Sequence, residues 1–212
     1  MARRSLLDLF ARVSRPFYDA MYRRGAPWES GPRPELVTLV ESGRITPDTV
    51  GPRALDLGCG SGADSIYLAS RGFDTIGVDL SPVAIDKARA AAGAASSSAV
   101  FVVGDLLDLP EEVEGPFDFV FDGGTIDDFP PAMRPRVVDV VARITRPDSV
   151  LVMWCFYARD ADLPRFSTSG PSRSGSPGIE PAELAALFAG WEVDRVAGGE
   201  GEGFACFVMT RR

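Results

Sequence analysis

A glycine-rich string in the first half of this 212-residue sequence carries its strongest chemical signal. Residues 55–62 read LDLGCGSG, end a short apolar run and precede a segment with helical character. Glycines allow backbone N–H groups to approach a ligand closely, and the N-terminus of a following helix adds positive potential. The string therefore predicts a site for an adenosyl-containing ligand, either a nicotinamide dinucleotide or another adenosyl compound.

Three acidic residues extend this signal, each at the end of a later apolar run: Asp79, Asp105 and Asp122. Asp79 follows Gly58 by about 20 residues, the separation at which a strand-end carboxylate can bond both hydroxyls of a ribose. The carboxyl ends of parallel strands lie at one edge of an open α/β sheet, and that edge binds ligands. We therefore expect the three carboxylates and the glycine string to surround one ligand.

Histidine is absent from the chain, and Lys87 is its only lysine. The absence of histidine excludes Ser-His-Asp hydrolysis, Cys-His proteolysis, histidine-ligated zinc and haem with a proximal histidine. The string also satisfies the loose dinucleotide pattern through Gly58, Gly60 and Ala63. A dehydrogenase would, however, need a histidine or a tyrosine–lysine pair to handle the hydride, and neither is available. The sequence therefore favours an adenosyl ligand other than a dinucleotide.

Predicted strands and helices alternate along the chain from residue 53 onward. Apolar runs predict strands at residues 53–57, 75–78, 100–103, 117–121 and 150–157, and helical spacing predicts helices at 64–70, 82–92, 135–144 and 181–188. This alternation predicts a three-layer, Rossmann-like α/β fold with a mostly parallel sheet and helices on both faces. Residues 191–196 and 204–210 flank a glycine- and glutamate-rich turn, which predicts a C-terminal antiparallel hairpin.

The N-terminal segment differs from the rest of the chain in charge. Residues 1–33 carry seven arginines and three acidic residues, a net charge of +4, so the remaining residues carry −12 to give the total of −8. Apolar residues from Leu6 to Met21 recur at helical spacing, and Pro16 is expected to divide the segment into two short helices. The acidic body argues against nucleic acid as a partner.

We expect one soluble, cytoplasmic domain at residues 35–212, a helical leader or lid at residues 1–34, and a monomer or weak homodimer. The polar stretch 158–178 is long for a loop inside a compact domain and is expected to form a substrate lid. No apolar run approaches the roughly 20 residues that a membrane span needs. The cysteines are widely spaced, at positions 59, 155 and 206, which favours a reducing compartment and predicts no metal site.

Taken in order, four motifs resemble those of class I S-adenosylmethionine-dependent methyltransferases. They are Asp56-x-Gly58-x-Gly60-x-Gly62, Asp79, Gly104-Asp105-Leu106 and Phe117-Asp118-x-Val120-x-Asp122. The resemblance covers about residues 50–157 and implies a seven-stranded sheet with one antiparallel strand. It also implies that S-adenosylmethionine is the cofactor of a methyl-transferring enzyme.

The resemblance implies a cofactor role for the residues that match these motifs and for their neighbours. These residues are Asp56, Gly58, Cys59, Gly60, Asp79, Leu80, Asp105, Leu106, Asp122 and Gly123. Within this set, Asp79 would bond the ribose hydroxyls and Asp105 the adenine amino group. Gly58 and Gly60 would border the methionine part, and Asp122 would lie under the sulfonium and its methyl group.

Residues 22–34 (YRRGAPWESGPRP) resemble the leader of the thiopurine, halide and thiol methyltransferases and of tellurite-resistance-type relatives. In that branch an N-terminal segment covers the cofactor, which implies that Trp28 closes the site. Alternatively, Trp28 pins the leader to the domain. Residues 122–129 and 146–149 depart from the sequences usual in that branch, so we expect a different acceptor.

Methyl transfer from a sulfonium depends mainly on aligning the acceptor with the methyl group and excluding water. A thiol, thiolate or halide acceptor needs no base, whereas a phenol or alcohol needs a carboxylate, a tyrosine or water. The candidate groups are Asp127, Asp128 and Tyr157, with Tyr18 and Tyr22 in the leader as further phenols and Arg159, Arg165 and Arg173 as contacts for an anionic acceptor. We expect Tyr157 to line the acceptor pocket.

The sequence thus predicts methyl transfer to a small molecule such as a thiol, halide or phenol. One alternative is a cofactor-binding protein without turnover that senses or scaffolds through its basic leader. Another is a protein or nucleic-acid methyltransferase. Against that reading, the sequence shows no extra recognition domain, no Asn-Pro-Pro-Tyr-type motif and no basic body.

Overall fold

The computed structural model describes residues 2–157 and 178–212, with side chains from residue 11 onward. Its elements, in chain order, are α1 (Ala2–Arg24), α2 (Pro34–Glu41), α3 (Pro47–Val50), β1 (Arg53–Leu57), α4 (Ala63–Ser70), β2 (Asp74–Asp79), α5 (Pro82–Ala94), β3 (Val100–Val103), β4 (Phe117–Asp122), α6 (Arg134–Arg143), β5 (Thr145–Phe156), α7 (Pro181–Leu187), β6 (Trp191–Gly199), η3 (Glu200–Glu202) and β7 (Phe204–Arg211). All strands and helices predicted from residue 53 onward are present. The largest difference in a strand start is that of β5, which begins at Thr145 rather than at residue 150.

The described strands form one seven-stranded sheet in the order β3-β2-β1-β4-β5-β7-β6. Strands β1 to β5 are parallel to one another, whereas β7 is antiparallel to both β5 and β6. The mostly parallel α/β fold and the reversed C-terminal hairpin are therefore confirmed.

The order of the strands creates a switch point between β1 and β4. The chain winds outward from β1 to β3 and then returns to place β4 on the other side of β1. In register, Leu57 pairs with Val78 on one side and with Asp122 on the other, so the carboxyl ends of β1, β2 and β4 are level. Open α/β sheets bind ligands at such a point.

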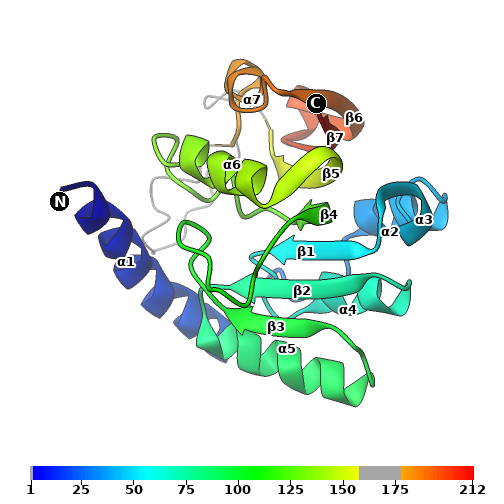
Figure 1. Cartoon of the computed structure of the whole chain (residues 1–212). Helices are drawn as coiled ribbons and strands as arrows, with labels where there is room; N and C mark the ends of the chain where they lie inside the picture. The colour runs from blue at the N-terminus through cyan, green and yellow to red at the C-terminus, as the bar shows by residue number, and fades with distance from the viewer. Residues whose placement is uncertain (1, 158–177) are drawn as a thin grey trace.

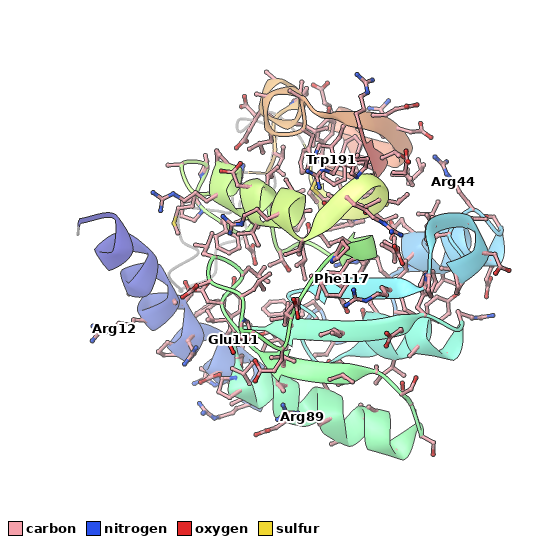
Figure 2. The ribbon with its side chains drawn as sticks, viewed as in Figure 1. Arg12, Arg44, Arg89, Glu111, Phe117 and Trp191 are labelled. Carbon is pink, nitrogen blue, oxygen red and sulfur yellow. The ribbon has the colours of Figure 1, made fainter. Side chains whose placement is uncertain are left out.

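An apolar layer on each face of the sheet packs helices against that face. Successive residues of a strand point to opposite faces, so each strand contributes side chains to both layers. Leu55 and Leu57 lie in one apolar cluster with Val137, Val138 and Val141 of α6. Ala54 and Phe119 lie on the other face with Leu68 of α4. Figure 2 shows Phe117 and Trp191 within the fold and Arg12 projecting from α1, and both aromatic side chains are buried.

The leader does not break at Pro16, so the prediction of two short helices was wrong. One helix, α1, runs from Ala2 to Arg24 with Pro16 inside it, and it passes across the end of the sheet toward which β1 and β3 point (Figure 1). A proline inside a helix costs one hydrogen bond and crowds the preceding turn. The C-terminal half of α1 offsets this cost by packing on α5, where Tyr22 is buried against Ala84.

Candidate functional site

The glycine string leaves β1 in a conformation that suits glycine. Gly58, Gly60 and Gly62 have φ values of 64°, 53° and 86°, a region that other L-residues rarely adopt. A Cβ atom on Gly58 would lie 2.1 Å from Oγ1 of Thr125, and one on Gly60 would lie 2.7 Å from the hydroxyl of Tyr22. The loop is therefore packed between the turn after β4 and the leader, with its backbone exposed to the cavity between them.

Asp79 ties this loop to the end of β2. Its Oδ2 accepts the N–H of Gly60 at 3.0 Å, and its Oδ1 accepts the N–H of Ser81 at 2.8 Å. Burial raises the pKa of Asp79 to about 6, although these two backbone donors favour the charged form and oppose the rise. Because a carboxylate oxygen can accept more than one hydrogen bond, Asp79 retains acceptor capacity for the hydroxyls of a ribose.

Asp105 continues the same side of the site after β3. Its Oδ1 accepts the N–H of Leu107 at 2.9 Å, which orients the carboxylate in the turn. Asp105 and Leu106 line the same cavity as Asp79 and Leu80. The structure therefore brings together the acid that ends β2 and the acid that follows β3, as the strand-end pattern predicted.

Asp122 has a different role from the one implied by the resemblance. It is fully buried, and its Oδ1 accepts the backbone N–H groups of Thr125 and Ile126 at 3.0 and 3.2 Å. Burial raises its pKa well above the usual range. Asp122 does not line the cavity, whereas Gly123 and Thr125 do. Its carboxyl group therefore shapes the turn instead of facing a ligand.

Of the three candidate catalytic residues, only Asp128 lines the cavity. Asp127 is buried, and its Oδ2 accepts the N–H of Phe156 at 2.9 Å, so it joins the turn after β4 to the end of β5. Tyr157 is buried in edge-to-face contact with Phe207, at 5.2 Å between ring centroids. The expectation that Tyr157 lines the acceptor pocket was therefore wrong.

Side chains along β5 alternate between the two faces of the sheet, and this alternation explains why the prediction for Tyr157 was wrong. Tyr157 continues the face of Met153 and Cys155, which packs in the core beneath α6 and α7. Trp154 and Phe156 point to the other side and line the cavity. The alternation was present in the sequence and identifies the two aromatic residues that the sequence analysis missed.

The leader forms the opposite wall of the cavity through Tyr18, Tyr22 and Trp28. Nε1 of Trp28 donates to the hydroxyl of Tyr22 at 3.1 Å, and the two rings meet edge to face. The hydroxyl of Tyr18 donates to Oδ2 of Asp128 at 2.9 Å. Trp28 remains 43% exposed, so its indole lies at the rim of the cavity.

Arg33 is a further cavity residue that the sequence analysis missed. Its backbone N–H donates to Oδ1 of Asp64 at 2.6 Å, and its guanidinium donates to the carbonyl of Gly123 at 2.5 Å. The same guanidinium lies 4.1 Å from the centre of the Trp154 ring, within the range of a cation–π contact. Arg33 therefore joins the end of the leader to the turn after β4 and to β5.

These walls enclose a cavity of about 530 Å³. The predicted cofactor residues that line it are Trp28, Asp56, Gly58, Cys59, Gly60, Asp79, Leu80, Asp105, Leu106 and Gly123. The expected contacts at Arg159, Arg165 and Arg173, and nearly all of the predicted lid at 158–178, lie outside the described residues.

A metal-binding group and a membrane-spanning helix are both absent from the part of the chain that the structure describes. No group of acidic or cysteine side chains there is arranged to hold a metal ion. All three cysteines are buried and free of disulfide bonds. No helix within the described ranges has the length and apolar character of a membrane span.

Comparisons with known proteins agree with this geometry. Residues 54–148 match a family model described as a methyltransferase domain. A 2-heptyl-1-hydroxyquinolin-4(1H)-one methyltransferase of Mycobacteroides abscessus is 29% identical over 154 residues, which are 72% of this chain and 65% of that protein. Thiocyanate methyltransferase 1 of Brassica oleracea is 31% identical over 140 residues, 64% of this chain and 59% of that protein. The chain spans less than two thirds of the first curated relatives, between 30% and 65%.

Solved structures share the whole fold. The structure described as "Conversion of a Disulfide Bond into a Thioacetal Group during Echinomycin Biosynthesis" superimposes with a TM-score of 0.72 at 28% identity, over 93% of this chain and 91% of that one. The N-methyltransferase NodS of Bradyrhizobium japonicum, solved with S-adenosylhomocysteine, has a TM-score of 0.68 at 18% identity, over 94% and 98% of the two chains, and so supports the fold. Residues 54–148 are therefore similar to a methyltransferase domain, and the chain shares its fold with methyltransferases that use S-adenosylmethionine as cofactor.

Proposed function

We propose that this protein transfers the methyl group of S-adenosylmethionine to a small-molecule acceptor. The observation that carries the proposal is that one cavity is lined both by the strand-end residues predicted to bind the cofactor and by aromatic side chains from the leader and β5. Its volume of about 530 Å³ lies in the range of small-molecule sites.

The residues present suit this cofactor. Asp79 offers carboxylate oxygens for the ribose hydroxyls, and Asp105 offers an acceptor for an adenine amino group. A Cβ atom at Gly58 would clash with Thr125, so the loop can pack this closely on the turn after β4 only with glycine at that position. S-adenosylmethionine, when bound, supplies an electrophilic methyl group on a sulfonium.

The protein's own part in the reaction is then alignment and exclusion of water. The leader residues Tyr18, Tyr22 and Trp28 cover the cavity, so we propose that residues 1–34 act as a lid over the domain at 35–212. The acceptor would enter between this lid and the aromatic face of β5.

The names of the relatives cover two kinds of acceptor. One relative is named for an aromatic hydroxyquinolinone and another for thiocyanate, an anion. We propose an acceptor among aromatic hydroxyl compounds, thiols and halides. An acidic body, with a net charge of −12 outside residues 1–33, supports action on small molecules over nucleic acids. Buried free thiols support a reducing, cytoplasmic setting, and we propose a monomer or weak homodimer.

Isothermal titration with S-adenosylhomocysteine tests the cofactor site. Asp79→Ala removes a buried carboxylate that accepts charge-assisted hydrogen bonds, and it should weaken binding by about 100-fold or more. Asp74→Ala, at the exposed opposite end of β2, is the matched control and should bind normally.

Release of S-adenosylhomocysteine from S-adenosylmethionine is then measured with a panel of phenols, thiols and halides. Normal binding by Asp79→Ala would rule out the cofactor site, and absence of release with every acceptor would count against the activity.

A further inference from the structure

The guanidinium of Arg33 is the one cationic group among the described side chains that line the cavity. It donates to the carbonyl of Gly123 at 2.5 Å, and it lies 4.1 Å from the centre of the Trp154 ring. These contacts hold the group in place and use one of its N–H donors, although a guanidinium has five. The other donors of Arg33 suit a planar anion such as a carboxylate, which can accept two parallel hydrogen bonds.

Asp64 places an acidic group beside this cation. It lies in the first turn of α4, directly after the glycine string, and its Oδ1 accepts the backbone N–H of Arg33 at 2.6 Å. Asp64 also lines the cavity, and its second carboxylate oxygen can accept a further hydrogen bond. The two side chains are close enough to interact electrostatically. Together they complement a ligand that carries a carboxylate and an ammonium group on the same carbon.

The spacing of the strands matches the length of the methionine part of S-adenosylmethionine. Asp79 and Gly123 each follow a residue that pairs with Leu57 of β1, one from β2 and the other from β4. They therefore lie two strand spacings apart, about 10 Å across the edge of the sheet. When Asp79 holds the ribose, an extended methionine chain reaches across this distance to Gly123, where the guanidinium of Arg33 is held.

We infer that Arg33 and Asp64 recognise the amino-acid end of the cofactor. The guanidinium of Arg33 binds its carboxylate, and the carboxylate of Asp64 binds its ammonium group. The inference rests on the proposed cofactor site and adds two binding residues, neither of which was among those predicted from the sequence. Because Arg33 belongs to the leader and Asp64 to α4, the bound cofactor also joins the proposed lid to the domain.

Three ligands separate the two contacts. S-adenosylhomocysteine carries the carboxylate and the ammonium group, its decarboxylated analogue carries only the ammonium group, and 5′-methylthioadenosine carries neither. The Kd of each is measured by titration calorimetry at pH 7.5. Burial raises the pKa of Asp64 to about 6, so its carboxylate is mostly ionised at that pH.

Each variant should affect a different set of ligands. Arg33→Met keeps the backbone N–H that Asp64 accepts, and it should weaken binding of S-adenosylhomocysteine alone, by about 10- to 100-fold. Asp64→Asn can still accept that N–H through its amide oxygen. It should weaken binding of S-adenosylhomocysteine and of the decarboxylated analogue by about 10-fold or more. Asp79→Ala should weaken binding of all three ligands, and Arg24→Met, an exposed arginine of the leader, should weaken none.

Equal losses of Arg33→Met with all three ligands would show that the guanidinium only maintains the shape of the cavity, and would overturn the inference. Unchanged binding of S-adenosylhomocysteine in Arg33→Met or in Asp64→Asn would also overturn it. So would an effect of Arg33→Met confined to the KM of an anionic acceptor. Failure of wild type to bind S-adenosylhomocysteine would overturn the inference together with the proposed cofactor site. The expected binding pattern without methylation of any acceptor would support the inference and count against methyl transfer alone.

Discussion

The ammonium of Lys87 donates to both carboxylate oxygens of Glu29, at 2.8 and 2.9 Å. The only lysine of the sequence thereby joins α5 to the turn of the leader that carries Trp28. The same carboxylate accepts the N–H of Ala26 at 2.8 Å, so Glu29 also closes the turn. This pair therefore fixes the end of the proposed lid beside the predicted cofactor site.

Breaking the Lys87–Glu29 pair should loosen the proposed lid by about the free energy that the pair contributes. The pair is partly exposed, at 39% and 18% of the two side chains, so it contributes about 0.5–1 kcal/mol. Lys87→Met should raise the Kd for S-adenosylhomocysteine by about two- to fivefold. Lys87→Arg should retain most of the affinity, and Asp86→Asn, exposed on the same helix, is the control. Equal affinity in wild type and Lys87→Met would show that the pair does not hold the lid closed.

Stability should fall as the pH rises from about 4 to about 7. Burial raises the pKa of Asp64 and Asp79 to about 6 and that of Asp127 to about 7, whereas these groups ionise near pH 4 in the unfolded chain. Over this range the folded protein binds more protons than the unfolded chain, so raising the pH favours unfolding.

The midpoint of urea unfolding, measured without ligand at pH 5 and pH 7.5, checks this sign. The midpoint should be lower at pH 7.5. Asp127→Asn can still accept the N–H of Phe156 through its amide oxygen, and it should reduce the difference between the two pH values. A midpoint that rises with pH in wild type would contradict the assignment of raised pKa values to these carboxyls.

Arg134 should be among the most costly single residues to replace. Its side chain is fully buried, and it donates to the carbonyls of Phe129 and Asp127 and to the carboxylate of Glu183 at 2.7–2.9 Å. Arg134→Met leaves a carboxylate and two carbonyls without this donor, which should cost about 3–5 kcal/mol of unfolding free energy. Arg143→Met, exposed at the end of α6, should change it by less than about 0.5 kcal/mol. Similar urea midpoints for both variants would show that the buried arginine contributes little.

Gly58→Ala should separate steric crowding from backbone strain. Gly58 and Gly43 both have positive φ values, 64° and 77°, but nothing lies within 4 Å of a Cβ atom on Gly43. Gly43→Ala should therefore cost only the strain, about 1–2 kcal/mol. Gly58→Ala should cost more, because its Cβ atom would meet Thr125, and it should also abolish binding of S-adenosylhomocysteine. Equal unfolding free energies for the two variants would show that the turn after β4 moves to accommodate the added Cβ atom at little cost in free energy.

Several features of the cofactor side follow from short stretches of sequence. The glycines at 58–62, the acid after β2 and the cap of α5 at Ser81 each depend on a few neighbouring residues, and local pattern predicts them. The alternation of apolar runs likewise predicts the parallel sheet, because each buried strand must have its own covering helix.

Other features depend on burial, which local pattern does not reveal. Asp122 and Asp127 look like site carboxylates in sequence, yet both turn inward to accept backbone N–H groups. Pro16 looks like a helix break, but packing of α1 on α5 keeps the helix continuous. In each case a contact between distant segments outweighs the local preference.

The sequence alone therefore predicted the fold and the strand-end residues that line the cavity, since both rest on backbone requirements and periodicity within about ten residues of each motif. The opposite wall of the cavity was decided only by the tertiary structure. Tyr18 and Asp128 are 110 residues apart and meet because α1 crosses the carboxyl edge of the sheet (Figure 1). Contacts of that separation depend on how the elements pack, and packing is a property of the whole fold.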